Sequence, residues 1–338
     1  LKTNQIATND GNNVAIDNSL NLKSYTTTAR DALTSAAGDM IYNSTTNKVQ
    51  VYTGSAWEDL GGIDALQIEY LVIAGGGGGN TNDDTAHGSG GAGGYLCNVN
   101  GENSGGNTSA QPSLFIPKST NLQITVGAGG SSNSAGSKSE FTSIMSVGGG
   151  TPRVGSYNKC GSAGGPNGRT SGGPTAANTN NIAGQGSASG QGVSYQGSGG
   201  GGGAGAAGSN GTNNQGGAGG AGLASSITGS SVTRGGGGGG GGTTGGAGGS
   251  GGGGAGGSGN NASGTSGTAN TGGGGGGSGI LTGGTPGSGG SGVVILRWAT
   301  ADATIGATRT GLTDGDVQTD GSDSYIVFTA GAGTITFT

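Results

Sequence analysis

Few residues of this chain have side chains suited to nucleophilic or acid–base chemistry. His87 is the only histidine, and it follows the polar stretch of residues 80–86. A hydrolase of the Ser-His-Asp type would have to use this histidine as its base. Polar stretches of this kind usually form loops at the protein surface. The sequence therefore favours a surface-loop position for His87 over a catalytic one.

The carboxylates are unevenly distributed. Glu140 and Asp302 delimit a segment that contains neither Asp nor Glu. The charged residues within it are all basic: Arg153, Lys159, Arg169, Arg234 and Arg297. A glycosidase needs two carboxyl groups about 5–10 Å apart, and a Ca²⁺ site needs several oxygen ligands. We predict a protein with no enzymatic activity, metal or cofactor. The alternative of a glycan depolymerase would need carboxylates outside residues 141–301.

Glycine-containing motifs of nucleotide-binding proteins have little meaning in this chain. Gly-x-Gly-x-x-Gly matches are frequent because glycine itself is frequent. A dinucleotide site also needs a strand before the motif and a helix after it, and the sequence shows no amphipathic helix. Residues 136–139, Gly-Ser-Lys-Ser, resemble a phosphate-binding loop but lack its Gly-Lys-Ser/Thr order. We predict no nucleotide site.

Two further groups of residues leave alternatives open. The carboxylates that follow residue 310 could bind Ca²⁺ weakly, although a solvated acidic turn is favoured: Asp314, Asp316, Asp320 and Asp323. Cys97 and Cys160 could form a disulfide, but two cysteines reveal little about the redox compartment.

Composition restricts the class of protein. Of 338 residues, 91 are Gly and only 9% are charged, against about 7% Gly and about 25% charged residues in average domains. An ordinary apolar core is therefore not available to most of the chain. The net charge of -5 disfavours nucleic acid as a partner. No apolar stretch approaches the roughly 20 residues of a membrane-spanning helix, so we expect no membrane insertion. The start at Leu1 rather than Met predicts a missing upstream segment.

Residues 1–62 are rich in Thr and Asn, with short alternating apolar runs. Residues 40–42, a polar turn at 43–47 and residues 49–52 predict a strand, a turn and a second strand, after which Trp57 returns to the apolar face. A two-stranded unit of this size is only marginally stable in water. We expect copies of the same chain to cover its apolar face, with packing on the rest of the chain as the alternative.

Residues 63–299 form a glycine-rich region bounded by apolar runs. We predict that the opening run, 68–74, pairs with the closing run, 292–298, and thereby holds the two ends of the region together. Residues 122–126 and 141–145 would complete a small sheet at its base. Between residues 148 and 292 apolar side chains are sparse, and glycine runs recur.

Three structures could account for the glycine runs. A flexible linker is typical of Gly/Ser sequence, but it would not be ordered throughout. Collagen is excluded because the chain has 6 Pro and no strict Gly-X-Y period. A bundle of extended polyglycine II helices explains the composition best. Such helices make no internal hydrogen bonds, and only residues without a Cβ let neighbouring backbones pair on every side. We therefore predict a mostly β and irregular fold, with little α-helix, around such a bundle.

Residues 300–338 return to ordinary β patterning. Residues 325–329 and 334–338 alternate apolar and polar side chains, and Gly331-Ala332-Gly333 lies between them. This pattern predicts a C-terminal β-hairpin.

The flanking motifs carry a resemblance to bacteriophage tail-fibre adhesins. Residues 38–43, 48–52 and 54–57 resemble the short β repeats of phage tail-fibre proteins, which are usually trimeric. The glycine-rich domain of phage adhesins is similar to the region 65–299 in four motifs: Tyr-Leu-Val-Ile-Ala-Gly at 70–75, Gly-Gly-Tyr at 93–95, Ile-Thr-Val-Gly-Ala-Gly-Gly at 124–130 and Val-Val-Ile-Leu-Arg at 293–297. In that family, polyglycine helices form a sandwich whose tip loops contact a bacterial surface receptor. The β-rich segment after residue 299 departs from the pattern, so the glycine region need not be the extreme tip.

The resemblance implies a homotrimeric, extracellular virion protein. Its partners would be other tail-fibre proteins and a bacterial surface receptor, either an outer-membrane protein or a glycan. Receptor contacts would come from the connectors between glycine helices, of which 80–88, 151–160, 187–196 and 222–234 are the less glycine-rich.

Two of these connectors contain the residues that we expect to contact a receptor. They are Tyr157 with Arg153 and Lys159, and Tyr195 with Gln196. A tyrosine ring flanked by polar side chains can stack on a sugar or pack on a protein loop, whereas tyrosines that merely cover the edge of the bundle are the alternative. The rival function is a structural fibre or filament subunit that uses the bundle as a stiff spacer.

Overall fold

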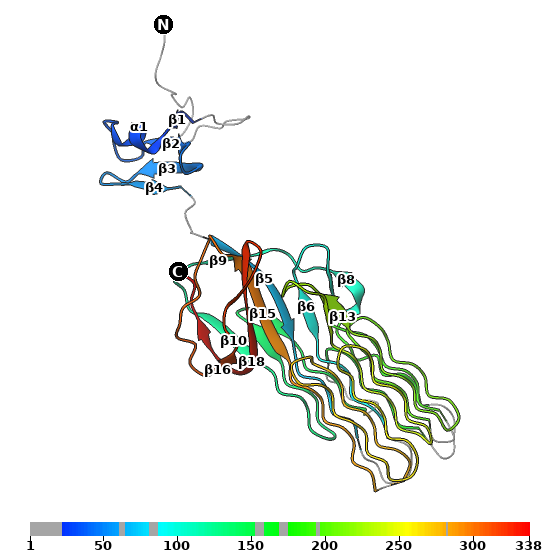
Figure 1. Ribbon diagram of the computed structural model, residues 1–338. Helices are drawn as coiled ribbons and strands as arrows, with labels where there is room; N and C mark the ends of the chain where they lie inside the picture. Colours follow the sequence, from blue (N-terminus) through cyan, green and yellow to red (C-terminus); the bar gives the residue numbers. More distant parts are fainter. Residues whose placement is uncertain are drawn as a thin grey trace. The chain divides into compact units, whose positions relative to one another are not determined.

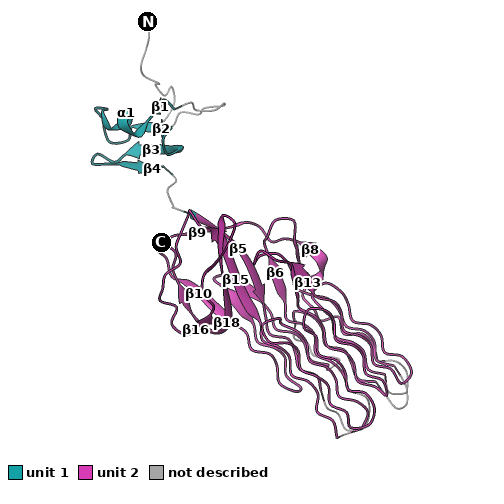
Figure 2. Ribbon diagram, in the orientation of Figure 1, with its two compact units in different colours: residues 1–65 teal, residues 66–338 magenta. Residues whose placement is uncertain are grey.

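The structure is a computed structural model, and it describes residues 22–60, 65–80, 87–152, 159–168, 175–193, 197–281 and 283–338. The chain divides into two compact units, Leu1–Ala65 and Leu66–Thr338 (Figure 2). Because each has its own strands and its own packing, the two units are described separately below. No helix in the described part of the chain is long and apolar enough to cross a membrane.

The first unit is a small four-stranded sheet with one short helix. Its strands lie in the order β1-β2-β3-β4, with β1 parallel to β2 and the other pairs antiparallel. Its elements are β1 (Ser24–Tyr25), α1 (Thr27–Asp31), β2 (Met40–Asn43), β3 (Lys48–Tyr52) and β4 (Trp57–Asp59). The predicted strand, polar turn and second strand are confirmed, and Asn47 adopts the left-handed conformation (φ 55°) that the turn requires.

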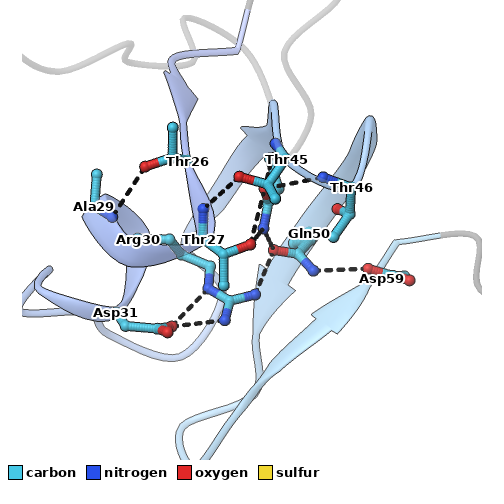
Figure 3. A network of polar contacts seen from close by, with 10 residues as sticks. Thr26, Thr27, Ala29, Arg30, Asp31, Thr45, Thr46, Gln50 and Asp59 are labelled. Atoms are coloured by element: carbon cyan, nitrogen blue, oxygen red, sulfur yellow. Dashed lines mark hydrogen bonds and ion pairs between the residues drawn. The ribbon is translucent and has the colours of Figure 1, made fainter.

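A polar network, not an apolar core, fills one face of this sheet (Figure 3). Gln50 is buried, and its Oε1 accepts hydrogen bonds from Arg30 Nη1 at 2.8 Å and from Asn43 Nδ2 at 2.9 Å. Its Nε2 donates to Asp59 Oδ1 at 2.7 Å. Ile41 is the only buried apolar side chain among the described residues of this unit. The network fixes the helix on the sheet, but it leaves the unit with little buried apolar surface.

The second unit is built on a ten-stranded sheet. The main path through its described strands is β12-β11-β10-β18-β15-β5-β6, while β16 and β17 also pair with β18 and β9 pairs with β5 (Figure 1). The strands are β5 (Ala65–Ile73), β6 (Tyr95–Cys97), β9 (Leu114–Pro117), β10 (Leu122–Val126), β11 (Ser139–Phe141), β12 (Ile144–Ser146), β15 (Val293–Ala299), β16 (Leu312–Asp314), β17 (Gln318–Asp320) and β18 (Asp323–Ile335). Two hairpins and a short 3-10 helix lie beside it: β7 (Asn103–Ser104) with β8 (Thr108–Ser109), β13 (Leu223–Ser225) with β14 (Val232–Arg234), and η1 (Gly105–Asn107).

The strands that bound the glycine-rich region pair as predicted. β5 and β15 are antiparallel, with Ile73 opposite Val293 and Glu69 opposite Arg297. Residues 122–126 form β10 in the same sheet. The run 141–145 is not one strand, however, because Thr142 adopts a positive φ of 53° and turns the chain between β11 and β12.

The predicted C-terminal hairpin is wrong. Residues Asp323–Ile335 form one 13-residue strand, β18, which continues straight through the expected turn. Pairing on both edges holds this part of the strand extended, since Ala332 lies opposite Thr125 of β10 and Gly331 opposite Leu312 of β16. Gly331 (φ 95°) sits beside the register shift between β16 and β18, so this glycine marks a local irregularity within a strand and not a turn.

Both faces of the sheet are covered. On β5, Ile68, Tyr70 and Val72 belong to one buried apolar cluster, which also contains Trp298, Phe328 and Phe337. Leu71 and Ile73 point to the opposite face, where the second cluster includes Tyr95 of β6 and, from the connectors of the glycine region, Ala204 and Ile227. The alternation of β-strand side chains thus lets β5 form one core with the C-terminal segment and another with the glycine region.

The glycine runs form a bundle with a three-residue period. The run 75–80 shows this most clearly, because its N–H groups donate in rotation to three different neighbours. Gly75 and Gly78 donate to the carbonyls of Ser137 and Ser134, Gly76 and Gly79 to those of Gly290 and Gly287, and Gly77 and Asn80 to those of Gly91 and Gly88. Three residues per turn without internal hydrogen bonds define a polyglycine II helix. The predicted bundle is confirmed.

The bundle contains parallel as well as antiparallel neighbours. The N–H groups of Gly236, Gly239 and Gly242 donate to the carbonyls of Gly251, Gly254 and Gly257, a constant offset along two parallel runs. A Cβ built on any glycine of the run 75–79 would come closer to a backbone carbonyl of another run than real Cβ atoms are found. Glycine is therefore required at these positions by close approach of backbones.

Candidate functional site

The connectors between glycine runs lie alternately near the sheet and at the far end of the bundle (Figure 1). Near the sheet, the carbonyl of Gln185 accepts from Tyr95 N at 2.9 Å, and that of Ala204 accepts from Gly106 N at 2.7 Å. Among the described residues, the turns at the far end make no backbone hydrogen bonds to strands of the sheet. The distal end therefore presents connectors that do not join the bundle to the sheet.

The distal turns are tied to one another in a row. Thr212 and Gln215 exchange backbone hydrogen bonds of 2.9 and 3.0 Å across a tight turn, and isolated parallel bridges join Gln215 to Thr244, Gly242 to Ser258 and Asn260 to Ile280. The exposed residues here define what we call the distal turn face: Thr212, Asn213, Asn214, Gln215, Thr243, Thr244, Ser258, Asn260, Asn261 and Leu281. Their side chains are mostly amides and hydroxyls on a backbone held by the bundle.

Three residues of the distal turn face have positive φ angles. Asn214 (64°) and Asn261 (57°) adopt a conformation that asparagine tolerates. Leu281 has a φ of 69° although it is an ordinary apolar residue, and it is 51% exposed. Strained backbone conformations at non-glycine residues are concentrated at functional sites. Among the residues of this face, Leu281 is therefore the one whose type and conformation are least expected if the turn has only a structural role.

Four of the five residues predicted to contact a receptor lie outside the described residues: Arg153, Tyr157, Tyr195 and Gln196. Lys159 is described and is exposed. It lines a cavity of about 180 Å³ on the side of the bundle, together with Thr151, Asn178 and Asn180. The structure therefore places one predicted residue in a cavity. The distal turn face was not singled out from the sequence, although its Asn and Thr pairs between glycine runs were visible there.

The comparison with protein families matches most of the chain. The model of the family described as "Glycine-rich domain" covers residues 45–299, which is 255 of the 338 residues. The chain belongs to this family. Neither the comparison with curated proteins nor that with solved structures gave a match. The matched segment of this glycine-rich protein contains the whole bundle, both distal and sheet-proximal connectors, and β15.

His87 of the glycine-rich domain is not in a surface loop, contrary to the sequence prediction. Its side chain is fully buried, and Nδ1 lies 2.9 Å from the carbonyl oxygen of Gly279 and 2.7 Å from Ser278 Oγ. The polar residues before it suggested a loop, but the chain re-enters the bundle at His87, whose carbonyl accepts from Gly241 N. Ser278 is also fully buried, so a substrate carbonyl has no access to this Ser–His pair.

A second cavity, of about 230 Å³, lies beside the start of β5 and the end of β15. Its lining includes the charged residues Glu69, Arg297, Asp302 and Asp323. Arg297 is one of its lining residues, with Nε 2.6 Å from Glu69 Oε2 and 3.8 Å from Asp323 Oδ2. One arginine thus links three adjacent strands, β5, β15 and β18. Because Arg297 neutralises the carboxylates on both sides, the arrangement suits a structural ion-pair clamp better than an acid–base pair.

The remaining residues considered from the sequence have structural surroundings. Asp314 pairs with Arg309, and no three His, Cys, Asp or Glu side chains in the described part of the chain are arranged to hold a metal ion. Lys138, in the phosphate-loop-like stretch, pairs with Glu140 at 2.5 Å. Cys97 and Cys160 are buried free thiols, not a disulfide. Burial raises the pKa of Cys97 to about 12 and that of Cys160 to about 11, so neither is a nucleophile at neutral pH.

Proposed function

We propose that this chain is the receptor-binding part of a bacteriophage tail fibre, which attaches the virion to a bacterial cell surface through loops of its glycine-rich domain. The observation that carries the proposal is the distal turn face. A hydrogen-bonded bundle holds ten exposed side chains at the end away from the sheet, which is the preorganisation that favours specific binding. Attachment of this kind involves no catalysis and no cofactor, and neither nucleic acid nor membrane insertion.

The rival proposal, a stiff structural spacer, accounts for the bundle but not for Leu281. A spacer gains nothing from an exposed leucine in a left-handed conformation, where Asn or Gly would be less strained. An apolar side chain surrounded by amides and hydroxyls is, by contrast, the usual composition of a contact surface with a dry centre and a polar rim.

The experiment is saturation binding of the labelled, full-length chain to intact bacterial cells. Leu281→Asn is the informative variant, because Asn tolerates the backbone conformation while removing the apolar side chain. We expect it to lower affinity at least tenfold without lowering the unfolding temperature. Val317→Asn is the matched control, since Val317 is 41% exposed and lies outside the distal turn face; it should leave binding unchanged.

Variants of Tyr157 and Tyr195 belong in the same series, because the sequence resemblance points to their connectors. Saturable binding that is lost in Leu281→Asn or in a tyrosine variant supports the adhesin. A chain that binds no cell which the parent virus infects would favour the spacer.

We further propose that the chain assembles as a homotrimer through its first unit. The face of the sheet opposite the polar network carries Met40, Tyr42, Val49, Val51 and Leu60, all half-buried or exposed, and Glu58 lies on the same face opposite Val51. The described strands and helix of this unit lie within residues 22–60, and small domains often need disulfides, metals or oligomerisation to be stable. Both cysteines lie in the second unit, and copies of this face would supply the burial that the first unit needs.

Sedimentation of the full chain tests this assembly. We expect a mass three times the 31.3 kDa of one chain. Val49→Lys should reduce it to that of one chain, because a charge placed between the apolar side chains of the inner strands β2 and β3 is costly to bury. Thr46→Lys, in the exposed turn between β2 and β3, is the control. A monomeric wild-type chain contradicts the proposal.

A further inference from the structure

The cavity beside Lys159 has a mixed lining. Four residues contribute polar side chains, Thr151, Lys159, Asn178 and Asn180, and the rest of the lining comes from Ala135, Val147, Cys160 and glycines 136, 148 and 150. A volume of about 180 Å³ corresponds to about six water molecules and is smaller than the pockets that hold drug-sized ligands. It therefore suits a single sugar ring or a comparable small polar group.

The charge at this cavity is positive and uncompensated. Lys159 makes no ion pair within the described residues, and no Asp or Glu occurs in the sequence between Glu140 and Asp302. The neighbouring Cys160 thiol contributes no negative charge at neutral pH, because burial raises its pKa to about 11. An anion in this cavity would meet one ammonium group and no competing carboxylate among the lining residues.

Asn178 supplies a positioned hydrogen-bond donor. Its side chain is only 6% exposed. Its backbone is held on both sides by Ser189, whose Oγ accepts from Asn178 N at 2.8 Å and whose N donates to the Asn178 carbonyl at 3.1 Å. Asn178 Oδ1 accepts from Asn180 N at 3.1 Å. This bond orients the amide and leaves Nδ2 available to a ligand.

We infer that this cavity is a subsite for an acidic sugar, with Lys159 contacting the anionic group and Asn178 Nδ2 donating to a ring or hydroxyl oxygen. The inference rests on the proposed attachment function, and it narrows the receptor to a glycan that carries carboxylate or phosphate. A charged hydrogen bond is roughly twice as strong as a neutral one. The anionic group should therefore contribute more than the hydroxyls to the difference in affinity between acidic and neutral sugars.

Ligand-observed NMR titration of the full chain tests the inference with three probes: glucuronate, glucose 6-phosphate and glucose. We expect a dissociation constant on the order of 1 mM for the preferred anionic sugar, typical of a small ligand, and at least tenfold weaker binding of glucose. Preference for glucuronate or for glucose 6-phosphate identifies the anionic group. Equal binding of all three sugars, or binding of none, overturns the inference.

Three variants test the named contacts. Lys159→Gln keeps most of the side chain but removes the charge, and it should reduce affinity about tenfold or more, whereas Lys159→Arg should retain most of it. Asn178→Asp keeps the acceptor for Asn180 N, but it replaces the donor by a charge that repels the ligand, and should abolish binding. Lys138→Gln is the matched control, because this exposed lysine is paired with Glu140 and does not line the cavity. Unchanged affinity in Lys159→Gln overturns the assignment.

Cell binding separates this inference from the proposed function. A chain that binds cells through the distal turn face but binds no acidic sugar overturns the cavity inference alone. A chain that binds acidic sugars in a Lys159-dependent way but binds no host cell supports the cavity and overturns the proposed attachment.

Discussion

Replacement of Gly79 by alanine measures how strictly the bundle excludes side chains. A Cβ at this position would lie 2.5 Å from the carbonyl oxygen and 3.1 Å from the carbonyl carbon of Gly276. Carbon–oxygen contacts between close backbones are about 3.3–3.6 Å, so the two runs must separate by roughly 0.8 Å. Gly79 N donates to Gly287 O at 3.0 Å, and Gly79 O accepts from Asn133 N at 2.9 Å. Bonds of this length do not survive such a displacement.

The expected magnitude follows from these bonds. Leaving a buried backbone group unpaired costs about 1–3 kcal/mol, and at least two groups are affected. Alanine restricts the unfolded chain and offsets about 0.4–1 kcal/mol of this cost. We therefore expect a net destabilisation of about 2–4 kcal/mol, equivalent to a fall in Tm of about 5–10 °C for a unit of this size.

The assay is thermal unfolding at a fixed scan rate, followed by circular dichroism, with Gly315→Ala as control. A Cβ at Gly315 meets no atom within 4 Å, and this glycine has no positive φ, so alanine should be neutral or slightly stabilising there. A Gly79→Ala variant as stable as the control would refute the view that backbone approach, and not composition alone, selects glycine in the bundle.

Three further predictions concern the surroundings of the bundle and the first unit. Burial alone would raise the pKa of Glu102, but hydrogen bonds donated by Ser225 and Ser226 outweigh this effect and lower the pKa. The stability gained is present above about pH 4.3 and is lost as pH falls through the lowered pKa of the folded state. Glu102→Gln should therefore flatten the decline of Tm measured between pH 5 and 3. Cys97 and Cys160 should resist a thiol-reactive maleimide at pH 7.5 in the native chain and react after denaturation, as mass spectrometry can show; rapid native labelling would contradict their burial. Gln50→Ala leaves Arg30, Asn43 and Asp59 each without one partner and should weaken the first unit by about 1–3 kcal/mol, seen as faster hydrogen exchange in residues 22–60 with unchanged exchange in the second unit.

The sheet could be predicted from sequence because its main strands are short apolar runs, which are typical of buried β-strands. β5, β10 and β15 are apolar runs with β-branched residues, and their pairing follows from their positions at the ends of the glycine region. The hairpin error at residues 331–333 arose because glycine is typical of turns and of irregular strands alike. Local sequence does not distinguish the two; the partners on both edges of β18 do.

The order of runs within the bundle could not be predicted for a different reason. Glycine runs are chemically alike, so no side chain specifies which run lies beside which. His87 shows the same limit at a single residue: its polar neighbours indicated a loop, and only the neighbouring carbonyl of Gly279 and hydroxyl of Ser278 explain its burial. The cavity at Lys159 likewise depends on Asn178 and Asn180, which are adjacent to it only through the packing of separate runs.

The run 75–80 has a consequence for how the protein is made. It is among the earliest parts of the second unit to be synthesised, yet two of its N–H groups donate to carbonyls at residues 287 and 290, more than two hundred positions later. Contacts of such long sequence separation slow folding, because the chain must close large loops before it gains hydrogen bonds. The run 75–80 therefore cannot complete its hydrogen bonds during translation until residues 287–290 have left the ribosome. Until then its backbone groups remain in water or pair elsewhere, which exposes the nascent bundle to misassembly and makes its final closure a late, concerted event.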